Sequence, residues 1–191
     1  MPAIQLFRQA LRDCQVSDEV VAQIMEGYED VTDNSKKPKK AAFMTQAMQR
    51  MDALLDPAVS HAVRDACACS KGGWRLKAVQ KVAQEYAGRP LEDRLRALGE
   101  VRYMGKPTLN ADGDIVGGVG DRGGFQCPCP VFSNSGHQGP VSLTYCYCCA
   151  GHLRFHYQIA LGVKLATKAV LSSALASEGT EPCRFVYEIV A

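Results

Sequence analysis

The sequence predicts an α+β protein, with a helical region over residues 1–104 followed by an antiparallel sheet with a helix over residues 105–191. Two observations predict this class. In the first region, apolar residues recur at the three- and four-residue spacing of helices that bury one face. After Gly105 the chain changes to short segments separated by glycine and asparagine turns, which is typical of strands. A chain of 191 residues can bury a sizeable core without disulfides, so we expect both regions to share one core.

The first region is expected to contain six helices. Ser17 is placed as the N-cap of the second helix, while Pro38, Pro57 and Pro90 stand where helices begin. A stripe of methionines in the third helix is typical of a buried core face. The other expected ranges are 2–13, 38–55, 57–69, 74–86 and 90–98.

The second region is expected to open with a hairpin over 107–116 that turns at Asp112-Gly113. Alternating apolar and polar residues predict a strand over Val141 to Tyr147, followed by a helix from Ala150 that ends at Gly162. Two closing strands are expected over 164–171 and 184–190.

A glycine-rich stretch over 117–124 matches G-x-G-x-x-G from Gly118 to Gly123. A dinucleotide site needs those glycines to open a helix, but here Phe125-Gln126-Cys127-Pro128 follows. We therefore expect a mobile loop or hairpin, which could act as a lid beside the cysteines, rather than a nucleotide site.

Charge and hydropathy exclude two classes of partner. With 22 basic and 20 acidic residues, the net charge of +2 does not provide the basic excess that nucleic-acid binding needs. The run Lys36-Lys37-Pro38-Lys39-Lys40 has no interleaved aromatic residue, so we expect a solvated turn between helices. No apolar run approaches about 18 residues, and the first residues do not form a signal peptide. We expect a soluble, cytoplasmic protein without a membrane partner, and the sequence leaves a homo-oligomer open.

The nine cysteines are the most unusual feature of the composition. Seven of them fall in three clusters, which are Cys67/Cys69, Cys127/Cys129 and Cys146/Cys148/Cys149, and only Cys14 and Cys183 stand alone. In a reducing compartment such clusters indicate metal, redox or catalytic use. Cys-x-Cys pairs hold one ion only where the chain bends, as the prolines beside Cys127 and Cys129 favour. We expect zinc, with an iron–sulfur cluster as the alternative.

The segment from Cys148 to His156 allows two further interpretations. If it begins as a strand, Cys148 and Cys149 face opposite sides. If it is already helical, Cys148, His152 and His156 share one face, because they are four residues apart. These groups could surround an ion, or Cys148 or Cys149 could be a nucleophile activated by a helix N-terminus and His152.

The nucleophile would need a third group to orient the histidine, and Asp121 and Glu178 have suitable chemistry. His156 stands between Phe155 and Tyr157, where a histidine is more often a hydrogen-bonded packing residue than a ligand.

Part of the sequence resembles known families. The residues Tyr145 to His152, Phe155 to Gly162 and Pro182 to Phe185 resemble the closing half of small-molecule-binding domains of the 4-vinyl reductase type, over about 141–190. From about Asp65 onward, the chain is also similar to a bacterial family of cysteine-rich proteins, and this resemblance implies no activity. The segments that carry it are MGKP, TYCYCCAGH, HYQIALGVKL and PCRFVYEI.

The first resemblance implies an apolar pocket for a small organic ligand and a zinc site. In some ligand-sensing relatives, zinc is held by a cysteine before the helix, by an acidic residue and a cysteine on the next strand, and by a last cysteine. The first and last fall on Cys146 and Cys183, but the middle two fall near Leu171 and Ser172, which do not supply those ligands. Cys127 and Cys129 are the natural replacements, and the competing ligands are Cys148, Cys149, His152, Cys67 and Cys69.

We therefore expect a zinc-thiolate protein that binds or senses a small apolar or mixed organic molecule. The alternatives are a metal- or cysteine-dependent enzyme acting on a small substrate and an iron–sulfur protein. The candidate catalytic residues are Cys148, Cys149, His152 and His156.

Overall fold

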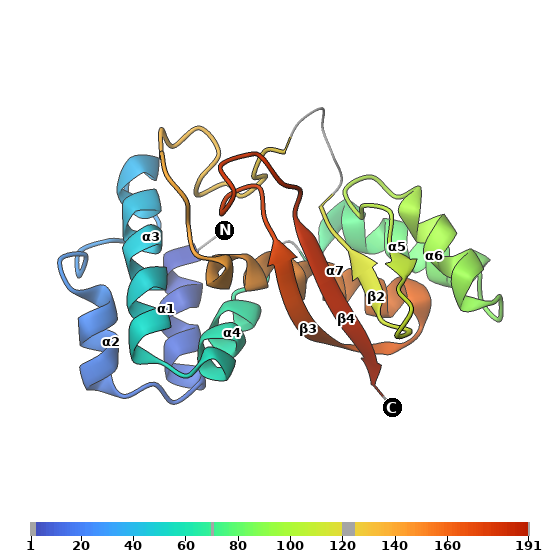
Figure 1. The fold of residues 1–191 in the computed structure, drawn as a ribbon, viewed down its shortest axis with the longest axis horizontal. Helices are drawn as coiled ribbons and strands as arrows, with labels where there is room; N and C mark the ends of the chain where they lie inside the picture. Colours follow the sequence, from blue (N-terminus) through green and yellow to red (C-terminus); the bar gives the residue numbers. More distant parts are fainter. Residues whose placement is uncertain (1–2, 70, 120–124, 191) are drawn as a thin grey trace.

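The computed structural model describes residues 3–69, 71–119 and 125–190 (Figure 1). Its helices and strands confirm the α+β class, with helices first and an antiparallel sheet after them. The elements of the first region are α1 (Ala3–Asp13), α2 (Asp18–Met25), α3 (Lys37–Leu54), α4 (Pro57–Ala66), α5 (Gly73–Glu85) and α6 (Leu91–Gly99). Those of the second are β1 (Thr108–Leu109), β2 (Ile115–Gly117), the 3-10 helix η1 (Leu143–Cys146), α7 (Tyr147–Leu161), β3 (Lys164–Ser172) and β4 (Arg184–Val190).

The expected helix signals act where the sequence places them. The Ser17 hydroxyl accepts a hydrogen bond from the Val20 amide at the start of α2. Proline stands in the first turn of α3 and of α4, where its missing N–H costs nothing. Gly162 ends α7 with a φ of +62°, a left-handed conformation that glycine adopts without steric cost.

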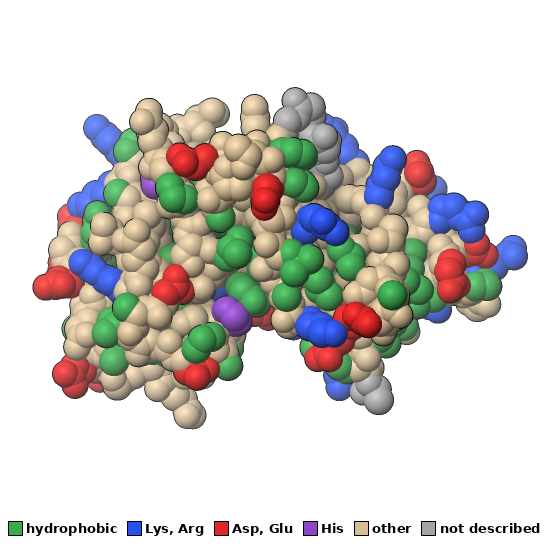
Figure 2. All heavy atoms as spheres, viewed as in Figure 1, with side chains coloured by type: hydrophobic (Ala, Val, Ile, Leu, Met, Phe, Trp, Pro, Cys, Tyr) green, Lys and Arg blue, Asp and Glu red, His purple; other side chains and the backbone are tan. Residues whose placement is uncertain are grey.

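The sheet has the strand order β1-β2-β4-β3, and each neighbouring pair is antiparallel. The expected hairpin forms β1 and β2, while Tyr187 on β4 pairs with Ile115 on β2 and Thr167 on β3. One face of the sheet packs on α7, which lies behind β3 and β4 in Figure 1. Apolar side chains also lie over the outer face of the sheet (Figure 2), where Leu171 and Ile189 are exposed.

The strand expected over Val141 to Tyr147 is wrong. This stretch enters η1 and then α7, which begins at Tyr147 rather than at Ala150. The Ser142 hydroxyl accepts a hydrogen bond from the Thr144 amide and so caps the turn. Thr144, Tyr145 and Cys146 are all buried, so the apolar and polar alternation does not reflect two faces of a strand.

Helix α7 occupies the centre of the molecule. It packs against α4, α5, α6 and β3, with α1–α4 to one side and α5 and α6 to the other in Figure 1. The Tyr187 hydroxyl of β4 donates to the Ala150 carbonyl of α7 at 3.0 Å. One cluster of buried side chains runs from Phe7 and Met48 in the first region to Leu153 and Phe185 in the second. Across the described ranges, none of the helices is both long and apolar enough to cross a bilayer.

A thiol cluster between two cavities

Three chain segments bring cysteines together around the start of α7. Cys67 ends α4 and Cys69 follows it, while Cys148 and Cys149 lie in the first turn of α7. Cys129 approaches from the long segment before η1. Cys148 is only 6% exposed, so its chemistry depends on the groups packed around it.

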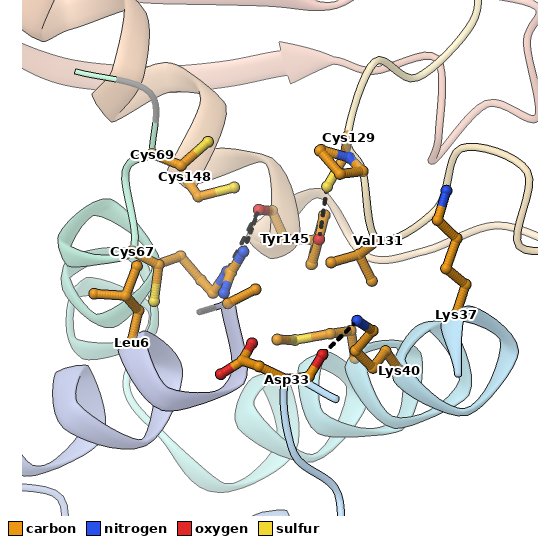
Figure 3. A pocket seen from close by; sticks show the side chains of 14 residues that line it. Leu6, Asp33, Lys37, Lys40, Cys67, Cys69, Cys129, Val131, Tyr145 and Cys148 are labelled. Atoms are coloured by element: carbon orange, nitrogen blue, oxygen red, sulfur yellow. Dashed lines mark hydrogen bonds between the residues drawn. The ribbon is translucent and has the colours of Figure 1, made fainter. Parts of the chain in front are cut away.

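A cavity of about 300 Å³ lies between the N-terminal helices and this cluster (Figure 3). Lys37 and Lys40 of α3 lie across it from Cys67, Cys69 and Cys148 (Figure 3). Its lining consists of the apolar residues Ala3, Leu6, Met44, Pro130 and Val131, the polar residues Asp33, Lys37, Lys40, Arg64 and Tyr145, and the thiols Cys67, Cys69, Cys129 and Cys148. This size is at the lower end for pockets that bind small organic molecules.

A second cavity of about 150 Å³ lies on the other side of the thiols. Its lining includes Cys149, His152 and Arg75. Cys69, Cys129 and Cys148 line both cavities. The three thiols therefore lie in the wall between the two spaces.

Arg64 is the charged partner of this cluster. It is 2% exposed, and its Nε and Nη2 donate weakly to the Tyr145 carbonyl at 3.4 and 3.3 Å. The guanidinium lies 4.5 Å from the centre of the Tyr145 ring. None of the ion pairs formed by the described residues includes Arg64. Burial alone would lower the pKa of Arg64, but the neighbouring thiols, Cys148 foremost, raise it overall.

Cys148 is the cysteine that this environment ionises. A hydrogen bond from the Cys149 thiol lowers the pKa of Cys148, burial opposes the change, and the charge and hydrogen bond of Arg64 lower the pKa further. The same hydrogen bond and burial raise the pKa of Cys149. The N-terminus of α7 also favours negative charge on Cys148. Cys148 is thus the thiolate of the pair, and Cys149 is the thiol that donates to it.

His152 and His156 lie on the same face of α7 as Cys148, as the helical alternative predicts, and their ring centres are 4.7 Å apart. His152 Nδ1–H donates to the Cys69 carbonyl, which leaves Nε2 as the acceptor of the neutral ring. Burial lowers the pKa of His152 to about 4, so the ring is neutral near pH 7. His152 lines the smaller cavity beside Cys148.

His156 is fully buried and its Nδ1–H donates to the His152 carbonyl at 3.0 Å. Neither cavity includes it in its described lining. Its position favours the packing interpretation over a direct role at the thiols.

The third group proposed from the sequence is not found at the cluster. Glu178 is exposed and borders a shallow hollow with Cys127, outside the described lining of the thiol cavities. Asp121 lies outside the described residues. So do the other residues from 120 to 124, which make up most of the glycine-rich stretch over 117–124. The Cys69 carbonyl orients His152 instead.

The predicted metal ligands come from three places in the chain, which are the long segment before η1 (Cys127 and Cys129), η1 itself (Cys146) and the residue before β4 (Cys183). Burial raises the pKa of Cys146, and the negative charges of ionised Cys183 and Cys127 would raise it further. The three thiols therefore interact electrostatically. Burial raises the pKa of Cys127 to about 12. Cys129 turns toward Tyr145, with 3.0 Å between its Sγ and the tyrosine hydroxyl. Among the residues that the structure describes, no three His, Cys, Asp or Glu side chains are grouped as ligands of one metal ion. Zinc remains a prediction.

Sequence reasoning missed the cations of the larger cavity. The lysine run is not wholly a solvated turn, because α3 begins at Lys37, and Lys37 and Lys40 face the cavity. Their spacing of three residues was a usable signal for one helix face. Arg64 also had a signal, since it falls three to four residues from Ser60 and Cys67 and one from Val63, on the helical stripe that is buried.

Comparisons of the chain with protein-family models, with curated proteins and with solved structures each find no match. The resemblance to the 4-vinyl reductase type therefore remains a prediction. The function has to be inferred from the site itself.

Proposed function

We propose that this protein binds a small organic molecule in the larger cavity and that the Cys148 thiolate reacts with it as a nucleophile. One observation supports this most directly. Cys148 and the buried Arg64 line the same cavity, Arg64 lowers the pKa of Cys148, and Arg64 has no carboxylate partner among the described residues. A structural cysteine needs neither the charge nor the cavity.

Each neighbouring group has a role in this chemistry. Arg64 keeps Cys148 ionised, and the Cys149 thiol donates a hydrogen bond that holds the thiolate in place. The sulfur attacks an electrophilic carbon of the bound molecule, so that a C–S bond forms while the leaving group departs with its electron pair. His152 is neutral and lines the smaller cavity beside Cys148, where its Nε2 can accept a proton.

Labelling with iodoacetamide at pH 7, followed by mass spectrometry of each cysteine peptide, tests the proposal. We expect Cys148 to be alkylated at least about ten times faster than a small model thiol, because more of it is thiolate. Cys148→Ser should remove the fast reaction. Cys183→Ser is the matched control, since Cys183 lies outside the described lining of both cavities. If no cysteine reacts faster than the model thiol, the proposal is wrong.

A zinc-thiolate site is the second candidate, favoured by the electrostatic interaction of Cys146 with Cys127 and Cys183. With Cys129 these thiols would form a four-thiolate set, in which the resemblance implies Cys146 and Cys183, and Cys127 and Cys129 replace its other two ligands. Zinc would supply a structural crosslink between the long segment before η1, η1 itself and the start of β4. Elemental analysis of protein purified anaerobically without chelator should find about one zinc per chain. The double variant Cys146→Ser/Cys183→Ser should lose it, whereas retained zinc would exclude this set and iron would indicate a cluster.

A further inference from the structure

We infer that the molecule accepted by the larger cavity is an organic anion whose negative group is recognised by Lys37 and Lys40. This inference rests on the proposed function, because it names the class of molecule that reaches Cys148. The recognising lysines and the reactive thiolate lie on opposite sides of the cavity (Figure 3).

Neither lysine has a carboxylate partner among the described residues. Lys37 Nζ donates to the Ser133 carbonyl at 3.1 Å, and Lys40 Nζ donates to the Asp33 carbonyl at 2.9 Å. Both partners are neutral backbone groups, so the positive charge of each ammonium remains available. An ammonium has three donors, and these contacts use one of them in each case.

Asp33 is the acidic residue in the described lining of the cavity, and both of its carboxylate oxygens already accept hydrogen bonds. They accept hydrogen bonds from the backbone amides of Ile4 at 2.9 Å and Gln5 at 3.1 Å, in the first turn of α1. This carboxylate therefore faces the N-terminus of α1 and forms no ion pair with either lysine among the described residues.

The start of α3 adds to the positive potential at this side. Its first turn has no acidic residue, and no side chain caps it. A helix N-terminus without an acidic cap attracts anions. The lysine charges and the helix dipole thus act in the same direction.

The rest of the cavity suits an apolar body between the two ends. Leu6, Met44 and Val131 contribute apolar side chains to its lining. Arg64 also lines the cavity, but it donates to the Tyr145 carbonyl and its charge stabilises the Cys148 thiolate, which leaves the lysines as the cations for the ligand. A molecule with a carboxylate or similar group at one end would therefore direct its other end toward Cys148.

Iodoacetate and iodoacetamide form a matched pair of probes. With either reagent the Cys148 sulfur forms a bond to the CH₂ carbon, the C–I bond breaks, and iodide leaves with the electron pair. The reagents differ in that iodoacetate is an anion. We expect the ratio of the iodoacetate rate to the iodoacetamide rate at Cys148 to exceed the ratio for a model thiol at least about tenfold, since the lysines attract the anion.

Charge-matched variants separate the cavity from general electrostatics. Lys37→Gln/Lys40→Gln should lower the rate ratio toward that of the model thiol, because the iodoacetate rate falls more than the iodoacetamide rate. Lys36→Gln/Lys39→Gln removes the same charge from the same helix start but changes no residue of the described cavity lining, so both rates should remain as in wild type.

The labelling results distinguish a failure of the anion inference from a failure of the proposed function. Fast iodoacetamide labelling of Cys148 without a preference for iodoacetate overturns the anion inference and leaves the proposed function standing. Equal losses in both lysine pairs also overturn it. Slow reaction of Cys148 with both reagents overturns the proposed function and the inference together.

Discussion

Arg64 and Cys148 depend on each other at the scale of single residues. An arginine that is 2% exposed is costly without a negative partner, and a buried thiolate is costly without a positive one. Each supplies the charge that the other lacks. The loss of either residue should therefore change the ionisation of the one that remains.

Arg64→Met should raise the apparent pKa of Cys148 by about one unit or more, because the stabilising charge and hydrogen bond are lost. The pH dependence of iodoacetamide labelling at Cys148 measures this value. Arg64→Lys keeps the charge and should give a smaller rise in the pKa of Cys148. This variant keeps the test informative if Arg64→Met does not fold. Arg154→Met, which removes an arginine paired with Asp65, should leave the value unchanged. An unaltered pKa in Arg64→Met would mean that Arg64 does not hold the thiolate.

The sequence predicts only part of this site. Spacing alone predicts that Cys148 and His152 share a helix face, because both lie on one helix. Arg64 comes from α4, about eighty residues earlier in the chain, and local patterns contain no information on that contact. The expected carboxylate is replaced by a backbone carbonyl, which no side-chain motif can reveal.

At the scale of elements, the start of α7 determines what the cysteines can do. Alternation over Val141 to Tyr147 predicts a strand, whereas the Ser142 cap begins a turn that continues into the helix. Cys148 consequently lies at a helix N-terminus, where a thiolate is favoured. The two closing strands, the hairpin and the six earlier helices were predictable, because each has regular periodicity and its own start and stop residues.

The close approach of α7 to α4 gives a test at this scale. A Cβ at Gly151 would lie 2.7 Å from Asp65 Oδ1 and 3.1 Å from Ala68 Cβ. Gly151→Ala should therefore lower the free energy of unfolding by about 1–3 kcal/mol through overpacking, despite the higher helix propensity of alanine. Gly99→Ala at the end of α6 is the control, since its nearest contact would be an ordinary 3.6 Å. Equal stability of both variants in urea unfolding would contradict this account of the packing.

At the scale of the whole molecule, α7 joins the two regions that the sequence separates at residue 105. Because this helix packs against α4, α5 and α6, the fragment 105–191 exposes a large apolar surface when made alone. We expect this fragment to lack cooperative unfolding in circular dichroism and dispersed amide signals in NMR spectra. A cooperative transition would show instead that residues 105–191 form an independent domain.

The buried histidines make the stability of the whole chain depend on pH. The folded pKa of His152, about 4, lies below its unfolded value near 6.5, so the unfolded chain binds more protons between these values. The free energy of unfolding should fall as the pH drops from about 6.5 to 4. His152→Asn, whose amide can still donate to the Cys69 carbonyl, should reduce this slope in urea titrations at several pH values. An identical slope in the variant would assign the effect to other groups.

The ionisation of Cys148 is the claim from which the proposed function follows, and its labelling rate against pH tests that claim most directly. Wild-type protein is treated with iodoacetamide from pH 5 to 10, and the rate at Cys148 is read by mass spectrometry. We predict a midpoint at least one unit below the value of about 8.5 for an ordinary cysteine. A midpoint at or above that value would show that Cys148 is a buried structural thiol and would contradict the proposed function.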